Sequence, residues 1–120
     1  MTQAAQQQRA TLRRGTVVTV ASPGVYSGKP RPAVVVQANR WLERHPSITL
    51  CPLTSTLIDA PLVRIPVAPS PDKDLRKRSQ LMADKLFTVP AAAIGSMVGR
   101  LEASAMADLD LGLRDWLDLQ

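Results

Sequence analysis

The 120-residue sequence has one cysteine, one histidine and four aromatic side chains, and each shortage excludes a class of site. A lone Cys51 can form neither an internal disulfide nor a cysteine-built zinc site, and its place within ITLCPL predicts a small buried thiol in a reducing compartment. A lone His45 excludes acid–base catalysis by a pair of histidines. Because aromatics are scarce, the core must consist mainly of Val, Leu, Ile and Ala.

The sequence also lacks a long apolar run. No stretch approaches the roughly 20 apolar residues needed to cross a bilayer, and the opening MTQAAQQQRATLRR has no apolar middle of the signal-peptide kind. We therefore expect a cytoplasmic protein with no membrane partner. No closely spaced set of His, Cys or carboxylate ligands is evident, so we expect no metal and no cofactor. At this length we expect a flexible leader over residues 1–12 and a single domain over residues 13–120.

Charge is unevenly distributed along the chain. The formal net charge is +5, but residues 1–101 carry 14 basic and 5 acidic side chains, whereas residues 102–120 carry one basic and five acidic ones. The body is therefore basic and the C-terminal segment acidic. A polyanion is the natural partner of such a body, although scattered Lys and Arg also serve solubility alone.

Short apolar runs bounded by Pro, Gly and Ser predict a mainly β fold. The expected strands lie in RRGTVVTVA, PAVVVQA, SITLCPLT, PLVRIPV, SQLMA and KLFTV. Short strands at this spacing indicate a small barrel or a strongly bent sheet. From Ala103 onward, apolar residues recur at helical spacing (Met106, Leu109, Leu113, Trp116 and Leu117), which predicts a closing helix with Trp116 packed in the core.

Arg31 lies between Pro30 and Pro32 at the start of an apolar strand. Prolines fix their own φ and hold the preceding residue extended, so the arginine has a stiff backbone. A hairpin folded about the midpoint of NRWLERHP pairs residues whose numbers add to 85, which brings Arg31 opposite Thr54. A guanidinium beside the hydroxyls of Thr54 and Ser55 suits a phosphate. The alternative is that Arg31 pairs with a carboxylate such as Asp84 while Thr54 only caps a strand end.

Two loops could extend such an anion site. KDLRKRS places Arg76, Lys77 and Arg78 together, which indicates a clamp for a nucleic-acid backbone or simply a solvated charge run. SPGVYSGK ends in Lys29 and offers Tyr26 as a stacking side chain.

The order and spacing of several blocks resemble the MazF/PemK family, the ribonuclease toxins of bacterial toxin–antitoxin pairs. The similarity runs through RRGTVVTV, KPRPAVVV, CPLTST, PLVRIPV, SQLMADKLFTVP and IGSMVGRLEASAMADLDLGLRDWL. It implies an SH3-like small barrel with a C-terminal helix, a homodimer, and a MazE-like antitoxin as partner. It also implies metal-independent cleavage of single-stranded RNA through attack by the 2′-hydroxyl, leaving 2′,3′-cyclic phosphate and 5′-hydroxyl ends.

The resemblance also implies roles for individual residues. The catalytic arginine of the family falls on Arg31 and its catalytic threonine on Thr54, with Asp84 as the candidate base. The family's recurring Asp-Gln is ADK here, so Lys85 replaces the glutamine and is expected to contact RNA. In the Kid branch an arginine two residues before that Asp acts as general acid, but this position is Met82.

Two other functions fit the same residues. CcdB-like gyrase inhibitors share the barrel and dimer and use a tryptophan near the C-terminus, and the expected packing of Trp116 argues against this function. An SH3-like binding module without catalytic activity is the second alternative, against which the presence of both Arg31 and Thr54 argues.

Overall fold

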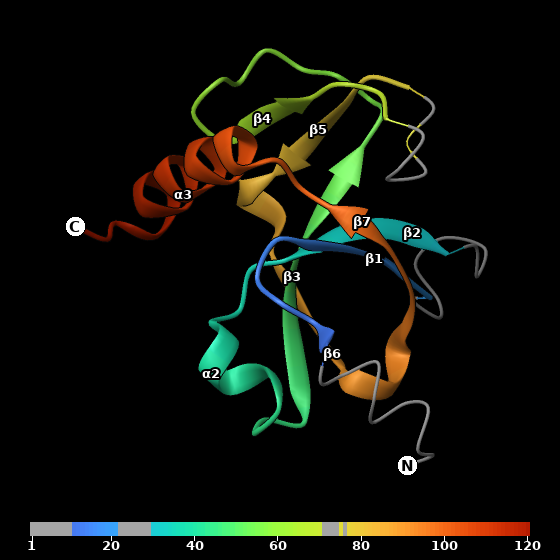
Figure 1. Ribbon diagram of the computed structural model, residues 1–120. Helices are drawn as coiled ribbons and strands as arrows, with labels where there is room; N and C mark the ends of the chain where they lie inside the picture. Colours follow the sequence, from blue (N-terminus) through green and yellow to red (C-terminus); the bar gives the residue numbers. More distant parts are fainter. Residues whose placement is uncertain (1–10, 22–29, 71–74, 76) are drawn as a thin grey trace.

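The computed structural model describes residues 11–21, 30–70, 75 and 77–120 (Figure 1). Within these ranges, seven strands form one sheet, and two α-helices and two short 3₁₀ turns accompany them. The strands are β1 (Thr16–Val20), β2 (Arg31–Val35), β3 (Ser47–Thr54), β4 (Arg64–Val67), β5 (Ser79–Met82), β6 (Phe87–Pro90) and β7 (Ile94–Arg100). The helices are α2 (Asn39–Leu42) and α3 (Ala103–Leu117), and the 3₁₀ turns are η2 (Ala83–Lys85) and η3 (Ala91–Ala93).

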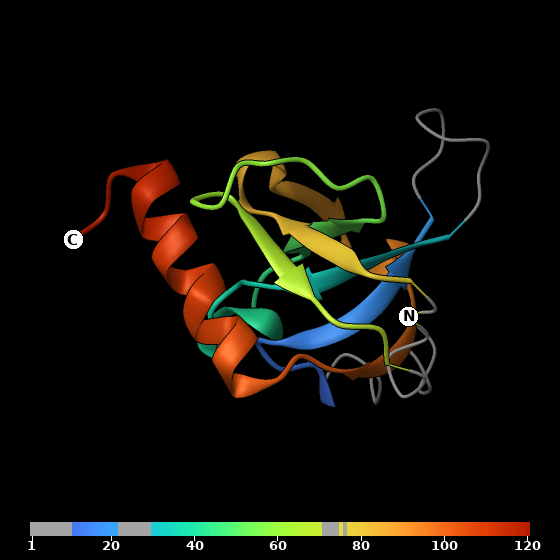
Figure 2. The same cartoon turned by 90° about the horizontal axis from the view of Figure 1, so that it is seen from above.

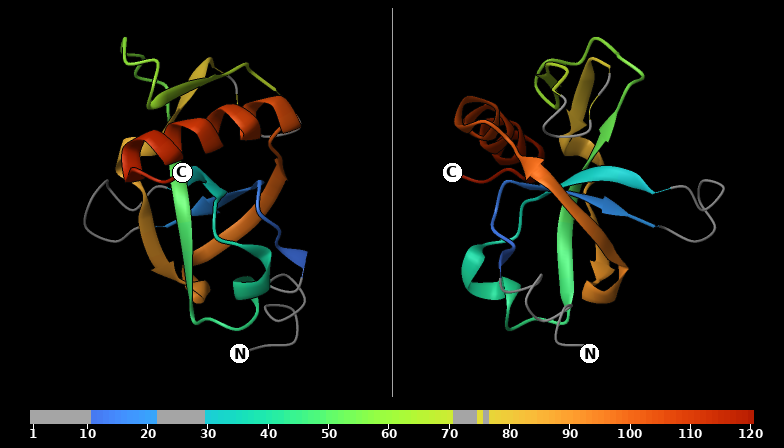
Figure 3. Two further views of the ribbon diagram at one scale, coloured as in Figure 1. Left: turned by 90° about the vertical axis from the view of Figure 1, so that its left-hand side faces the viewer. Right: turned by 45° about the vertical axis from the view of Figure 1, so that its right-hand side comes forward.

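Strand β3 belongs to both halves of the sheet. Its first part pairs with β2 and β6, and its last two residues pair with β5, which in turn pairs with β4. The strand order is β4-β5-β3-β2-β1-β7, with β6 pairing β3 off this path. Figure 3 shows the two halves diverging around β3. All of the pairings among the described strands are antiparallel and they follow an open path, so the expected β fold is confirmed as a bent sheet but not as a closed barrel.

The six strands predicted from sequence are present, and β3 has the predicted bounds. Strand β7 was not predicted, because the two glycines and the polar residues of this strand interrupt any apolar alternation. Its pairing with β1 contains register shifts. A Cβ on Gly95 would lie 2.6 Å from Thr19 Oγ1, so glycine allows the two backbones to approach closely here.

Alternating side chains of the central strands bury both faces of the sheet. Val17, Val34 and Cys51, which are Cα partners, contribute to one core cluster with the apolar face of α3. Their neighbours Val18 and Val35 contribute to the other cluster, which lies beside α2 and β6. This alternation explains why VVV is continuous in the sequence. Leu12, which the sequence analysis placed in the leader, is also buried in the second cluster; the first ten residues of that leader lie outside the described part.

Helix α3 closes the first core cluster, as predicted, but Trp116 is not a core residue. Leu109 and Leu113 are buried, and Gly112 lies so close to the segment before β4 that a Cβ would be 2.8 Å from the Leu62 carbonyl oxygen. Trp116 is 53% exposed and Leu117 is 48% exposed. Both lie near the end of a helix that extends past the strands, so no strand covers them (Figure 2). The predicted packing of Trp116 in the core is therefore wrong, and it no longer argues against a gyrase inhibitor.

Among the helices in the described ranges, none is both long and apolar enough to cross a membrane.

Candidate active site at the end of strands β2 and β3

The register of β2 and β3 is the one that the sequence predicts. The partners Ala33 and Pro52, Val34 and Cys51, and Val35 and Leu50 all add to 85. Arg31 begins β2 and Thr54 ends β3, each two residues beyond the last of these pairs. At that point the strands take different partners, because Arg31 pairs with Val20 of β1 and Thr54 pairs with Gln80 of β5. The two candidates therefore lie at the same end of the β2–β3 pair, one on each side of the point where the strands separate.

A proline explains why the strands separate here. The last partners are Ala33 and Pro52, and Pro32 follows on the β2 side. Val36 donates its backbone N–H to the Thr49 carbonyl, and hydrogen-bonded pairs alternate along an antiparallel ladder, so residue 32 is at a position whose N–H would face β3. A proline has no N–H. Without this donor, the ladder between β2 and β3 ends, and β3 continues alongside β5.

The Thr54 side chain is held by the segment that follows it. Its Oγ1 accepts a hydrogen bond from the Thr56 backbone N–H at 3.1 Å. A hydroxyl that accepts such a bond keeps its own hydrogen for donation. Thr54 is half-buried and Ser55 is exposed.

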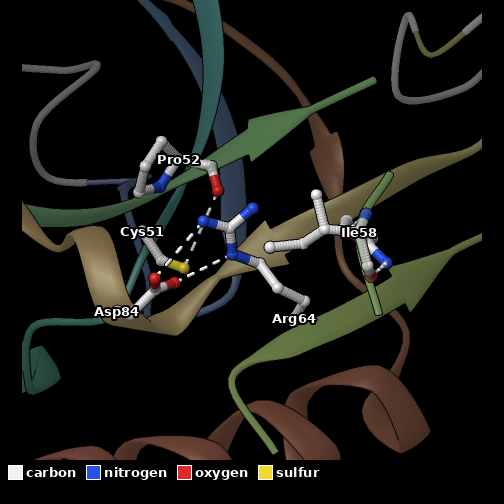
Figure 4. Close-up of polar contacts among 6 residues, drawn as sticks. Cys51, Pro52, Ile58, Arg64 and Asp84 are labelled. Atoms are coloured by element: carbon white, nitrogen blue, oxygen red, sulfur yellow. Dashed lines mark hydrogen bonds and ion pairs between the residues drawn. The ribbon is translucent and has the colours of Figure 1, made fainter. Parts of the chain in front are cut away.

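Asp84 pairs with Arg64, not with Arg31. Arg64 Nε donates to Asp84 Oδ1 at 2.9 Å and Arg64 Nη2 donates to Oδ2 at 3.3 Å, so both carboxylate oxygens face one guanidinium (Figure 4). The Arg64 side chain is 9% exposed and that of Asp84 is 22% exposed. The hydrogen bond from Arg64 is the main cause that lowers the pKa of Asp84. A carboxylate with a lowered pKa is a weaker proton acceptor than an unpaired one.

Arg64 is the residue of this region that the sequence analysis missed. It lies in PLVRIPV, where an arginine interrupts an apolar strand, and that interruption was the available signal. Its Cα partner on β5 is Met82, so its guanidinium reaches the start of η2 and the carboxylate there. Sequence spacing alone could not pair β4 with β5, because many residues separate the two strands along the chain.

The remaining predicted contacts are only partly described. Lys77, Arg78 and Lys85 are exposed, and Lys85 directly follows Asp84 on η2. Tyr26, Lys29 and Arg76 lie outside the described residues. His45 is exposed in the connection before β3, at the opposite end of that strand from Thr54, as predicted. Within the described ranges, no group of three His, Cys, Asp or Glu side chains could hold a metal ion.

Cys51 is buried and has no disulfide partner, as predicted. Burial is the main cause that raises its pKa to about 12. The thiol therefore stays neutral at physiological pH and is a packing residue, since the thiolate is the nucleophilic form.

Two open cavities flank α3. One, of about 550 Å³, is lined by Arg14, Gly15, Arg100 and residues of α3; the other, of about 240 Å³, lies between α3 and residues 61–66. In the first, Arg14 Nη2 donates to Asp110 Oδ1 at 2.6 Å. Gly15 donates its backbone N–H to the Val35 carbonyl, so this cavity lies at the opposite end of β2 from Arg31. Neither of these two cavities is lined by Arg31 or Thr54.

The fold is shared with solved structures of other proteins. A mycobacterial endoribonuclease, solved in complex with its cognate antitoxin, is similar with a TM-score of 0.73 at 22% identity, covering 92% of this chain and 98% of that one. MazF in a MazE–MazF complex from Deinococcus radiodurans is similar with a TM-score of 0.73 at 17% identity, covering 91% and 98%.

Sequence comparison is more specific. Residues 13–117 match the family described as PemK-like, MazF-like toxin of type II toxin-antitoxin system. The chain is 40% identical over 108 residues to a protein of Mycolicibacterium smegmatis named "Probable endoribonuclease MazF", covering 90% of this chain and 98% of that one. The chain therefore belongs to the PemK/MazF toxin family.

The Arg64–Asp84 pair predicts a pH-dependent loss of stability. We expect Asp84→Asn to lower the free energy of unfolding by about 1–3 kcal/mol at pH 7, because a buried guanidinium loses its charged partner. Since the folded pKa of Asp84 is lowered, its contribution is complete above the unfolded pKa and disappears as the pH falls through the folded one. Urea unfolding of both proteins should show a difference that is constant near neutral pH and shrinks below about pH 4.

The exposed Asp108 of α3 provides the control, since Asp108→Asn removes the same charge without a buried partner. Equal unfolding free energies for wild type and Asp84→Asn at pH 7 would show that the ion pair does not stabilise the fold.

Proposed function

We propose that this protein is a toxin that inhibits translation and growth by cleaving single-stranded mRNA at specific sequences without a metal ion. The observation that supports this most directly is the β2–β3 register, which places Arg31 and Thr54 at one end of the strand pair in a chain of the PemK/MazF family. The similarity to a relative named as an endoribonuclease supports the same activity. The bent sheet that diverges around β3 is compatible with the SH3-like frame that the family resemblance implies.

In the proposed reaction the RNA supplies its own nucleophile. The 2′-oxygen forms a bond to the adjacent phosphorus, the bond from phosphorus to the 5′-oxygen breaks, and the products carry a 2′,3′-cyclic phosphate and a 5′-hydroxyl. One proton leaves the 2′-hydroxyl and one is taken up by the 5′-oxygen. Arg31 stabilises the charge that accumulates on the non-bridging oxygens, and the Thr54 hydroxyl donates a hydrogen bond to one of them.

We propose that Asp84 holds the η2 turn in place and does not accept the proton. Arg64 faces both of its oxygens and lowers its pKa. The pair fixes η2, and therefore also the backbone of Lys85. We propose that Ser55, Lys77, Arg78 and Lys85 contact RNA, together with three residues outside the described ranges (Tyr26, Lys29 and Arg76).

The proposed partners are a second copy of the chain and a MazE-like antitoxin in the cytoplasm. Both of the similar structures described above are complexes, one of an endoribonuclease with its cognate antitoxin and one of MazE with MazF. A cell must block such a nuclease, and a flexible acidic segment of an antitoxin would be attracted to the same cations that bind RNA.

A gyrase inhibitor is the second candidate function, favoured only by the exposed Trp116. A supercoiling assay distinguishes it from the ribonuclease.

The proposed roles predict which substitutions abolish cleavage. We expect Arg31→Ala and Thr54→Val to reduce the cleavage rate of a long RNA by about 10²-fold or more, because each removes a preorganised donor to the phosphate. Thr54→Ser should retain most activity since it keeps the hydroxyl, whereas Arg31→Lys should be poor because an ammonium cannot make the planar two-point contact. Rates would be measured on labelled RNA with a metal chelator present.

Arg40→Ala is the charge-matched control, because Arg40 is an exposed arginine on α2 at the other end of β3. Cleavage by Arg31→Ala at the wild-type rate would refute the assignment of Arg31.

A second prediction concerns the nucleophile. RNA with one 2′-deoxy sugar at the cleaved position should bind with nearly unchanged affinity and stay intact, since the attacking oxygen is missing. Mass spectrometry of products from the all-ribose strand should show cyclic phosphate ends. Cleavage of the deoxy-substituted strand would mean that water attacks instead.

A third prediction concerns inhibition. Antitoxin and 2′-deoxy-blocked RNA should compete for one surface, and RNA affinity should fall by roughly 0.7 log units per log unit of salt for each phosphate contacted. The measurement is displacement of fluorescent RNA by the antitoxin encoded beside the toxin gene. Tight simultaneous binding of both ligands would show that inhibition acts at a distance from the RNA site.

A further inference from the structure

The segment that follows Thr54 has few attachments to the rest of the fold. Residues 55–59 are all exposed and belong to no helix or strand. In the described part of the chain, three hydrogen bonds hold this segment. One is the Thr56 N–H bond to Thr54 Oγ1, and the other two join Ile58 to the side chain of Gln80.

Gln80 attaches this segment in the way that a neighbouring strand would. Its Oε1 accepts from the Ile58 backbone N–H at 3.1 Å, and its Nε2 donates to the Ile58 carbonyl at 3.0 Å. The side-chain amide therefore satisfies both backbone groups of one residue in the absence of a strand partner. Figure 4 includes Ile58, which these bonds join to β5.

The backbone of Gln80 is itself firmly placed. Its Cα partners are Thr54 on β3 and Pro66 on β4, so it lies in the middle of a row of three strands. The same residue is thus the backbone neighbour of Thr54 and the side-chain anchor of the segment four residues further on. Fixing both ends of this short stretch limits how far Thr54 Oγ1 and its donor Thr56 N–H can move.

We propose that Gln80 is a positioning residue for the cleavage reaction, which holds the 55–59 segment so that the Thr54 hydroxyl is directed at the reacting phosphate. The inference rests on the proposed ribonuclease function. Gln80 acts through the segment rather than by contact with RNA, because its amide is occupied by Ile58. Phosphate contacts elsewhere supply most of the affinity for RNA, so the anchor should affect the rate of cleavage more than binding.

The test separates binding from chemistry in the full-length protein. Gln80→Leu keeps the size of the side chain and removes both hydrogen bonds. We expect its single-turnover cleavage rate at saturating RNA to fall by about 10-fold to 100-fold, the usual effect of a small misplacement of a catalytic group. The dissociation constant for 2′-deoxy-blocked RNA should change by less than about twofold.

Gln37 offers a matched control within the same chain. Its side chain accepts from the Thr49 backbone N–H and donates to the carbonyls of Trp41 and Ser47, so it anchors backbone in the same manner at the other end of β3. Gln37→Leu should lower the melting temperature at least as much as Gln80→Leu while keeping the wild-type cleavage rate.

Gln80→Glu supplies a readout that a general loss of stability would not give. An ionised carboxylate can accept from the Ile58 N–H but repels the Ile58 carbonyl, and protonation restores a donor. The cleavage rate of Gln80→Glu relative to wild type should therefore rise as the pH is lowered from 7.5 toward the ordinary glutamate pKa of about 4.3.

Three outcomes would overturn the inference: a wild-type cleavage rate in Gln80→Leu, a loss of RNA affinity that accounts for its lower rate, or an equal loss in Gln37→Leu. Failure of the proposed function is distinguishable, because wild type itself would then leave the RNA intact. If Gln80→Leu does not fold, the pH dependence of Gln80→Glu decides, and a ratio to wild type that does not rise on acidification refutes the proposal.

Discussion

The change of partner along β3 is the constraint on which the rest of the structure depends. An eight-residue strand serves two halves of the sheet, pairing with β2 and β6 first and with β5 at its end. Pro32 lacks an N–H at a position that faces β3, so β2 cannot follow β3 any further. Because the strands separate there, Arg31 and Thr54 lie on either side of the point of separation. The two prolines beside Arg31 thus fix its backbone, and one of them also helps to end the ladder.

The rigidity of this edge comes from the core behind it. Central strands bury side chains on both faces, with Val34 and Cys51 in one cluster and Val35 and Leu50 in the other. A slip of one residue would exchange the two sets, so packing on both faces fixes the register. Residues 55–59, by contrast, are exposed, and two hydrogen bonds join Ile58 of this segment to the side chain of Gln80 on β5.

The sequence predicts those features that depend on residues close together along the chain, and it does not predict those that depend on distant segments. The register of β2 and β3 depends only on the length of a short connection, and it was predicted correctly. The exposure of Trp116 depends on where the strands end beneath α3, which helical spacing does not contain. The Arg64–Asp84 pair depends on the pairing of β4 with β5, two strands that are far apart along the chain. For this reason the sequence did not predict the role of Arg64, and Asp84 was considered as a partner of Arg31 instead. Strand β7 was missed because pairing with β1, not an apolar pattern, defines it.

The Arg64–Asp84 pair also bears on the charge that a phosphate would meet. A transition state that accumulates negative charge is stabilised by nearby cations and opposed by a nearby free carboxylate. Asp84 lies on η2 directly before Lys85, and without a partner it would weaken the attraction of that lysine for any anion. Arg64 compensates the carboxylate from the buried side, where its own charge is costly to leave unpaired. The pair therefore holds the turn and reduces the negative potential beside Lys85.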